Sequence, residues 1–263
     1  MTNTVSDHKM PALFLGHGSP MNVIENNLFT KSWEILGKSL PRPKSILSIS
    51  AHWETRGTYV TAMESPPTLH DFGNFPQALF DFQYPAKGEP NLAKKIQSLV
   101  KKTAVGLDTQ WGLDHGTWAL LAKLYPDADI PVVQMSLDRT LTPLEHYEIG
   151  KELRPLRNEG VLILGSGNLV HNLNHLNYSQ SEKSADWAIE FDEAIKELLL
   201  QGDHQSILEF ETLGEIAKLS VPTPEHFLPL IYIIALQEKN EKIIFPVEGM
   251  TLGSISMRSV LIS

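Results

Sequence analysis

The 263-residue sequence contains no cysteine. Disulfides, thiolate metal ligands and cysteine nucleophiles are therefore excluded, and a metal site must use histidine, aspartate or glutamate side chains. Hydrophobic residues make up 42% of the chain and charged residues 20%, which is typical of a globular protein with a sizeable core. We interpret residues 1–263 as one domain, with residues 1–10 as a flexible N-terminus.

Basic residues and long apolar runs are both scarce. The net charge of −9 argues against a nucleic-acid partner and gives no support for docking to anionic membranes. No stretch approaches the ~20 apolar residues of a membrane span. The first ten residues are polar and lack the apolar core of a secretory signal. We expect a cytoplasmic protein, a monomer or small homo-oligomer, whose partners are small molecules.

Apolar and amphipathic stretches alternate along the chain, which predicts an α/β fold. The runs that predict buried strands are 12–15, 45–50, 131–137 and 161–164. The patterns that predict helices are 91–102, 142–153 and 185–200. Thr142 and Glu145 form a capping-box pattern at the start of the second helix. The alternation indicates a central, mainly parallel or mixed sheet flanked by helices.

Five of the ten histidines stand at predicted element ends. His17, His52 and His171 follow predicted strands, and ligands in open α/β sheets bind beyond the carboxyl ends of strands. His115 lies in a turn before an apolar helix, and His226 lies where Pro224 indicates a helix start. The shared placement of these histidines predicts one common site.

Other polar residues have supporting or structural interpretations. Ser166 and Asn168 follow the run 161–164 and are candidates to orient a ligand through hydrogen bonds. His146 lies on a predicted exposed helix, and His204 lies in a predicted loop. We interpret both of these histidines as structural.

The irregular stretch 69–88 is rich in aromatic residues. Long segments without regular structure are usually functional or disordered, so we interpret this one as a substrate lid. Phe72, Phe75 and Tyr84 are its candidates for stacking on an aromatic ring. The alternative interpretation is a separate hydrophobic cluster beneath a long loop.

Five motifs occur in a fixed order along almost the whole chain, from residue 11 to the C-terminal "TLGSISMRS". They are "PALFLGHGSPMN", "SAHWET", "LDHGTWALL", "GSGNLVHNL" and "PEHFLPL". Each alone is weak, but the ordered set resembles the 4,5-DOPA dioxygenase extradiol family. That family belongs to the class III extradiol ring-cleavage dioxygenases of the LigB-like superfamily.

The resemblance implies a role for each of the five histidines. It implies that His17, His52 and His226 are metal ligands. It implies that His171 performs acid–base catalysis beside the metal and is a possible fourth ligand in a zinc form. It implies that His115 is a second catalytic histidine, in contact with substrate or oxygen. The residues themselves leave Glu225 open as an alternative to His226, because neighbouring helical side chains point in different directions.

The resemblance also implies an activity. It implies a non-haem, metal-dependent enzyme that opens the ring of DOPA or a related catechol with O2, giving a muconic semialdehyde of the 4,5-seco-DOPA type. Fe²⁺ is the metal expected for activity, and Zn²⁺ fits the same histidine ligands. Two alternatives stay open at this point: a zinc-dependent hydrolase and a non-catalytic zinc-binding protein.

Overall fold

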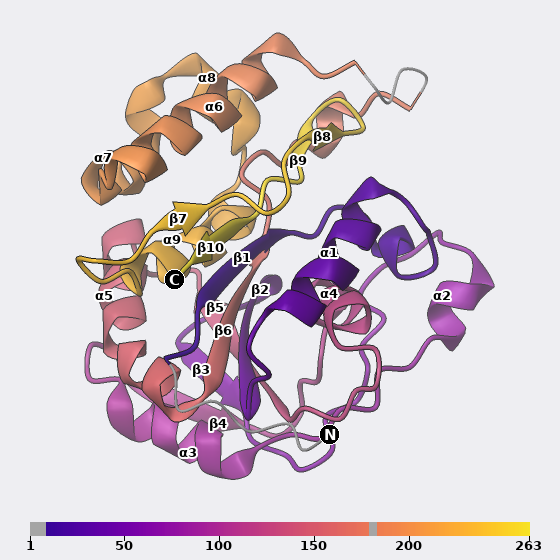
Figure 1. Ribbon diagram of the computed structural model, residues 1–263, viewed down its shortest axis with the longest axis vertical. Helices are drawn as coiled ribbons and strands as arrows, with labels where there is room; N and C mark the ends of the chain where they lie inside the picture. Colours follow the sequence, from indigo (N-terminus) through magenta and orange to yellow (C-terminus); the bar gives the residue numbers. More distant parts are fainter. Residues whose placement is uncertain (1–8, 179–182) are drawn as a thin grey trace.

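An eight-stranded sheet forms the centre of the computed structural model, which describes residues 9–178 and 183–263 (Figure 1). The strand order along the sheet is β4-β3-β5-β2-β6-β1-β10-β7. The strands are β1 (Ala12–Gly16), β2 (Ser45–Thr55), β3 (Thr58–Thr61), β4 (Val105–Asp108), β5 (Val132–Asp138), β6 (Val161–Gly167), β7 (Ile243–Ile244) and β10 (Val260–Ile262). A separate two-stranded hairpin consists of β8 (Met250–Thr251) and β9 (Ile255–Ser256).

The middle of the sheet is parallel and its margins are mixed. Strands β5, β2, β6 and β1 pair in parallel, whereas β10 and β7 add antiparallel strands beside β1. On the other side β3 pairs antiparallel with β5 and parallel with β4. The predicted mainly parallel or mixed sheet is confirmed, and all four predicted strands form. Strand β2 continues to Thr55, past the predicted end at residue 50.

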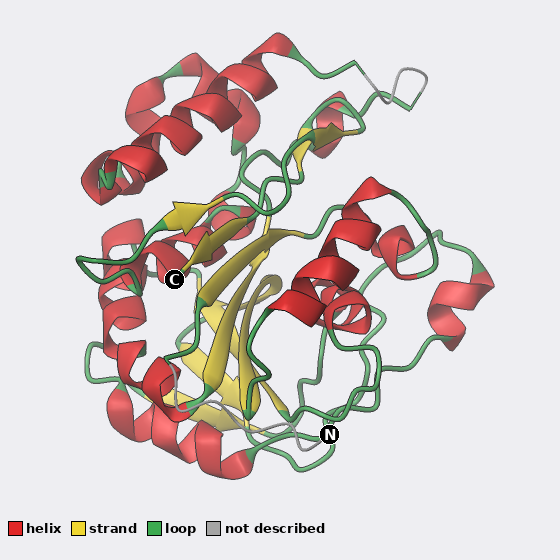
Figure 2. Cartoon of the chain, in the orientation of Figure 1, coloured by secondary structure: helices red, strands yellow, loops and turns green. Residues whose placement is uncertain are grey.

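Helices cover both faces of the sheet, as Figure 2 shows. The α-helices are α1 (Leu28–Ser39), α2 (Gln77–Asp81), α3 (Pro90–Leu99), α4 (His115–Leu124), α5 (Pro143–Glu152), α6 (Asp186–Gln201), α7 (His204–Leu208), α8 (Glu215–Ser220) and α9 (Leu228–Ala235). The 3₁₀ helices are η1 (Pro20–Val23), η2 (Arg154–Glu159), η3 (Leu173–His175), η4 (Phe210–Leu213) and η5 (Pro224–His226). Of the helices in the described residues, none has the length and apolar character needed to cross a bilayer.

Alternation along β1 shows how the two faces are buried. Ala12 and Phe14 belong to one core cluster, together with residues of α3, α5, α6 and α9. Leu13 and Leu15 belong to the other, together with residues of α1 and α4. Successive strand side chains point to opposite faces, so a strand covered on both sides is apolar throughout. This explains why these strands appear in the sequence as short continuous apolar runs.

The two histidines interpreted as structural both lie in helices. The capping box of Thr142 and Glu145 is confirmed at α5, but His146 is fully buried rather than exposed, and this prediction is wrong. Helix α5 packs on the all-apolar α9, and His146 Nδ1 lies 2.9 Å from the Tyr232 hydroxyl there. His204 begins helix α7 rather than lying in a loop, and its ring hydrogen-bonds side chains of neighbouring segments.

Arg157 links the segment before β1 to the segment after α9. Its buried guanidinium donates to the carbonyl oxygens of Met10 and Leu236 and to both carboxylate oxygens of Glu241. Burial works to raise the pKa of Glu241, but hydrogen bonds from Arg157 and Lys9 outweigh it and hold that pKa at about 2. The Glu241 carboxylate is therefore more acidic in the folded protein than in an unfolded chain.

This depressed pKa predicts a specific loss of stability in acid. Glu241 contributes stability above its ordinary pKa of 4.5, and that contribution is lost as the pH falls through about 2. We expect the free energy of unfolding of the wild type to fall more steeply over this range than that of Glu241→Gln. Urea unfolding at a series of pH values measures both, and equal pH slopes would contradict the prediction.

Candidate metal and substrate site

The carboxyl ends of neighbouring parallel strands carry the first histidines to one edge of the sheet. His17 directly follows β1, His52 lies in the last part of β2, and His171 follows β6 after a short turn. In the sheet order β6 lies between β2 and β1, so these ends are adjacent. The pairing of β2 with β5 shifts register between Ile49 and Glu54, and such a bulge re-aims the side chains within it.

Backbone crowding explains the two glycines that flank His17. A Cβ on Gly16 would lie 2.7 Å from the carbonyl oxygen of Ser256, closer than real side chains approach. Gly18 has a φ of 59°, in the left-handed region that glycine adopts without steric cost. The strand therefore ends against a neighbouring segment and turns sharply, with His17 held between these two constraints.

The structure brings all five predicted histidines together. The ring centroids of His17, His52 and His226 lie 4.9, 5.2 and 5.1 Å apart in pairs. His115, the first residue of α4, lies with its ring 3.9 Å from that of His52. The ring of His171 stacks on that of His226 at 3.5 Å and an interplanar angle of 8°. The expected common site is therefore present as a cluster of imidazoles.

The nitrogens of this cluster are spaced for a metal ion. The groups whose donor atoms all lie within 4.8 Å of one another are His17, His52 and His115, and His171, Glu225 and His226. The Nε2 atoms of His17 and His52 are 3.2 Å apart. His226 Nε2 is buried and has no hydrogen-bond partner among the described residues. The His226 ring lies 5.2 and 5.1 Å from the rings of His17 and His52, so its orphaned nitrogen belongs to a cluster that fits a cation with imidazole ligands.

Hydrogen bonds at Nδ1 fix the tautomers of two of these imidazoles. The Ser166 hydroxyl donates to the Gly116 carbonyl oxygen, so it accepts a hydrogen bond from His17 Nδ1 at 2.9 Å. His226 Nδ1 donates to Glu225 Oε1, also at 2.9 Å. Both bonds leave Nε2 with the lone pair that a metal requires. Ser166 therefore orients a candidate ligand, and the Glu225 carboxylate lies against the candidate ligand His226.

Asp71 is a residue of this site whose role in holding His115 was not predicted from the sequence. Its Oδ1 accepts from the backbone N–H of His115 and its Oδ2 from His115 Nδ1, both at 2.9 Å. Asp71 Oδ2 also lies 3.7 Å from His52 Nδ1. Burial works to raise the pKa of Asp71, but hydrogen bonds from His115 outweigh it, so the carboxyl stays ionised. The signal available in the sequence was the presence of a carboxylate in the aromatic-rich stretch 69–88.

Burial keeps the imidazoles neutral. Burial, reinforced by the neighbouring imidazoles, holds the pKa values of His17 and His226 well below their usual range. Burial also lowers the pKa of His52 to about 3 and that of His171 to about 4. Neutral imidazoles are the form that binds a metal, so these histidines need lose no proton to do so at neutral pH.

The cluster opens into a cavity of about 320 Å³ that also carries aromatic and aliphatic walls. Phe72 and Phe75 line it, and the Phe72 ring lies 5.5 Å from that of His115; their stacking on an aromatic substrate stays a prediction. Tyr84 does not line the cavity, so the prediction that it stacks on an aromatic ring there is wrong. Tyr84 is buried, and its hydroxyl donates to the Tyr125 carbonyl oxygen in the core beneath the loop. The alternative of a hydrophobic cluster under the loop therefore applies to Tyr84.

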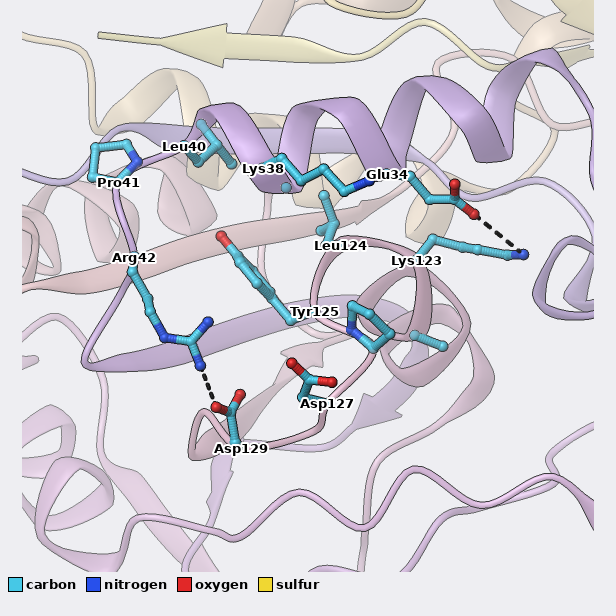
Figure 3. A pocket seen from close by; sticks show the side chains of 13 residues that line it. Glu34, Lys38, Leu40, Pro41, Arg42, Lys123, Leu124, Tyr125, Asp127 and Asp129 are labelled. Atoms are coloured by element: carbon cyan, nitrogen blue, oxygen red, sulfur yellow. Dashed lines mark hydrogen bonds and ion pairs between the residues drawn. The ribbon is translucent and has the colours of Figure 1, made fainter. Parts of the chain in front are cut away.

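A larger hollow of about 600 Å³ lies elsewhere, between the C-terminal ends of α1 and α4 (Figure 3). Its charged side chains face one another: Arg42 pairs with Asp129, and Lys123 lies 3.9 Å from Glu34. None of the five clustered histidines lines it. Four of its charged side chains pair with one another in this way, and we assign no ligand to this hollow.

Comparison with known proteins finds close relatives along the whole chain. Residues 11–251 match the family model described as the catalytic LigB subunit of aromatic ring-opening dioxygenase. A 4,5-DOPA dioxygenase extradiol of Escherichia coli K12 is 51% identical, covering 98% of this chain and 96% of that protein. Its namesake from Beta vulgaris is 39% identical, covering 90% of each. A crystal structure of an uncharacterized E. coli K12 protein matches at 45% identity with a TM-score of 0.85, covering 97% of this chain and all of that one.

Single substitutions distinguish the ligands from their neighbours. We expect His17→Ala and His226→Ala to lose bound Zn²⁺ or Fe²⁺, because each removes an inward-facing nitrogen. His171→Gln and Glu225→Gln should retain the metal, because they alter a stacked ring and a hydrogen-bond acceptor. Elemental analysis after metal loading measures the content, with circular dichroism as the folding control. Metal loss in Glu225→Gln but not in His226→Ala would make Glu225 the ligand.

Proposed function

This chain belongs to the LigB family of aromatic ring-opening dioxygenases, and we propose that it opens the ring of DOPA or a related catechol at the bond beside the two hydroxyl groups. It is an extradiol catechol dioxygenase, whose substrates are a small catechol and O2. The observation that carries the proposal is the convergence of five histidines in one aromatic-walled cavity. We propose a muconic semialdehyde of the 4,5-seco-DOPA type as the product.

We assign His17, His52 and His226 as the residues that hold the metal. The buried, unpartnered Nε2 of His226 and the close Nε2 atoms of His17 and His52 support this assignment. Fe²⁺ is the proposed active metal, which when bound lets the catechol pass electrons to O2. Zn²⁺ suits the same all-imidazole set by the usual order of metal affinities, so nothing in the ligand types rejects it.

His171 and His115 are the proposed acid–base residues. Burial lowers the pKa of His171 to about 4, so its imidazole is neutral at pH 7 and can accept a hydrogen bond from a catechol hydroxyl. The Nδ1–H of His115 donates a hydrogen bond to Asp71 Oδ2, so its Nε2 is the ring nitrogen left to face a bound catechol. Both rings line the cavity, so both can exchange protons with a bound catechol.

The segment around Asp71 supplies the proposed lid. Phe72 presents its ring edge-on to His115, while the adjacent Asp71 carboxylate holds the same imidazole. One loop therefore supplies both the aromatic ring of Phe72 and the carboxylate that fixes the His115 imidazole. A catechol ring placed in the cavity contacts both rings. The cytoplasmic location and the monomeric or small homo-oligomeric state stay predictions.

Metal exchange tests the activity. We expect the zinc-loaded protein to be weakly active, and chelation followed by anaerobic loading with Fe²⁺ to raise turnover of DOPA many-fold once O2 is admitted. Absorbance of the yellow semialdehyde follows the reaction, and mass spectrometry should show both atoms of O2 in the product. A dicarboxylic acid product would contradict extradiol cleavage. Full activity of the zinc form without O2 would favour a zinc hydrolase.

The role of Asp71 yields a second expectation. Asp71→Asn removes the negative charge that orients His115, and changes to such supporting residues typically cost 10–100-fold in metal affinity or activity. We expect a fall of about that size in kcat with unchanged iron content. Asp81→Asn is the matched control, because Asp81 is an exposed carboxylate on the same stretch. Equal activity of the two variants would exclude a positioning role for Asp71.

A further inference from the structure

A second cavity adjoins the histidine cavity. It has a volume of about 420 Å³, and it shares part of its lining with the first. The residues that line both are Ser19, Phe75, Tyr178 and Leu252. Since the same side chains border both spaces, these residues form a neck between an inner chamber, which holds the histidines, and an outer chamber.

The two chambers differ in chemistry. Beyond its histidines, the inner chamber is walled by aliphatic and aromatic side chains, among them Leu173, Leu176 and Ile255. Leu173 is 59% exposed, although a large apolar side chain is more stable when covered. The outer chamber carries polar side chains, including those of Asn22, Asn27 and Glu25. Within the described lining of both chambers, the histidines aside, Glu25 is the charged side chain.

Leu252 holds its place at the neck in an unusual backbone conformation. It lies in the turn between β8 and β9 with a φ of 50°, in the left-handed region. Glycine and asparagine adopt that region most readily, whereas a leucine there is uncommon and marks a constrained position. Such constrained residues cluster at ligand sites, where surrounding structure holds them.

The hairpin that carries Leu252 is anchored to the metal site through its backbone. Ile255 forms an antiparallel bridge with His171, and the Ser256 N–H donates to the Val170 carbonyl oxygen at 3.0 Å. The Leu252 carbonyl oxygen accepts a hydrogen bond from the Asn177 N–H at 2.9 Å. These bonds fix the leucine side chain relative to the imidazoles.

We infer that the outer chamber is the subsite for the end of the substrate's ring substituent, and that Leu252 at the neck determines which substituents enter. This inference rests on the proposed function. The preferred substrates are catechols whose substituent is apolar next to the ring and neutral or cationic at its far end. The aliphatic wall covers the first part of the substituent, and the polar groups with Glu25 receive the second.

The charge at the far end of the substituent provides the first test. The probes are dopamine and 3-(3,4-dihydroxyphenyl)propionate, which place an ammonium and a carboxylate on the same two-carbon arm. We expect dopamine to bind the zinc-loaded protein more tightly, by up to about fivefold, because pairs with an exposed carboxylate are weak. Anaerobic isothermal titration calorimetry measures both dissociation constants without turnover.

Charge-reversal variants provide the control for that test. Glu25→Lys should reverse the preference between the two probes. Glu197→Lys makes the same change in net charge at an exposed position of α6 that lines neither chamber, so its preference should match the wild type. Equal binding of the two probes by the wild type, or the same response in both variants, would overturn the charge part of the inference.

Leu252→Asn provides the second test. Asparagine tolerates the left-handed backbone, so the thermal midpoint should not fall, as it would if the leucine were needed for folding. Binding of 4-propylcatechol should weaken by about tenfold, as for lost contacts of this size in an apolar pocket, while binding of unsubstituted catechol stays unchanged. Equal weakening for both catechols would overturn the role of Leu252.

Turnover by the iron-loaded enzyme separates this inference from the proposed function. If no catechol is cleaved but the binding preferences hold, the proposed function fails and the subsite stands. If 4-methylcatechol is cleaved and neither dopamine preference nor Leu252 dependence appears, the function stands and the subsite fails. The two ideas are therefore decided by different measurements.

Discussion

An oxygen acceptor at Nδ1 of an imidazole is the interaction on which the whole site depends. A neutral imidazole has one donor and one acceptor nitrogen. A hydrogen bond that holds the proton at Nδ1 therefore leaves the lone pair on Nε2, where it is available to a metal or a ligand. Three such acceptors come from three parts of the fold: Ser166 from β6, Glu225 from η5 and Asp71 from the loop before α2. Ser166 and Asp71 lie 149 and 44 positions from the imidazoles they hold, whereas Glu225 is the neighbour of His226, so two of the three contacts form only in the folded chain.

Gathering imidazoles in one buried cluster has an electrostatic consequence. Burial and mutual repulsion oppose protonation, as the lowered pKa values of His17, His52 and His226 show. A cation placed among them meets imidazoles that are already neutral, and its binding adds to the stability of the folded site. The close approach of backbone at Gly167, where a Cβ would lie 2.1 Å from the His226 carbonyl oxygen, shows how tightly this packing is built.

Sequence patterns predicted the sheet and the clustered histidines because both follow from local features. Buried parallel strands are continuous apolar runs, and their carboxyl ends meet wherever the strands are adjacent. Patterns did not predict Asp71, whose partner His115 is 44 positions away and is brought near only by the folded loop. The predictions for Tyr84 and His146 were wrong for the same reason. Composition does not show which side of a loop, or which face of a helix with mixed residues, another element will cover. The resemblance to the family implied roles for the histidines, but it did not identify the residues that accept hydrogen bonds from their Nδ1 atoms.

The C-terminal segment connects the histidine end of the cavity to the hairpin that carries Leu252. Strand β10 extends the sheet beside β1, and the backbone at Ser256 packs against Gly16 and accepts a hydrogen bond from Asn168. A few residues earlier, the β8–β9 hairpin presents Leu252 to the cavity. This anchoring uses backbone groups, whereas the wall uses side chains. Side chains of the hairpin can therefore change, and substrate preference with them, while the imidazoles keep their positions.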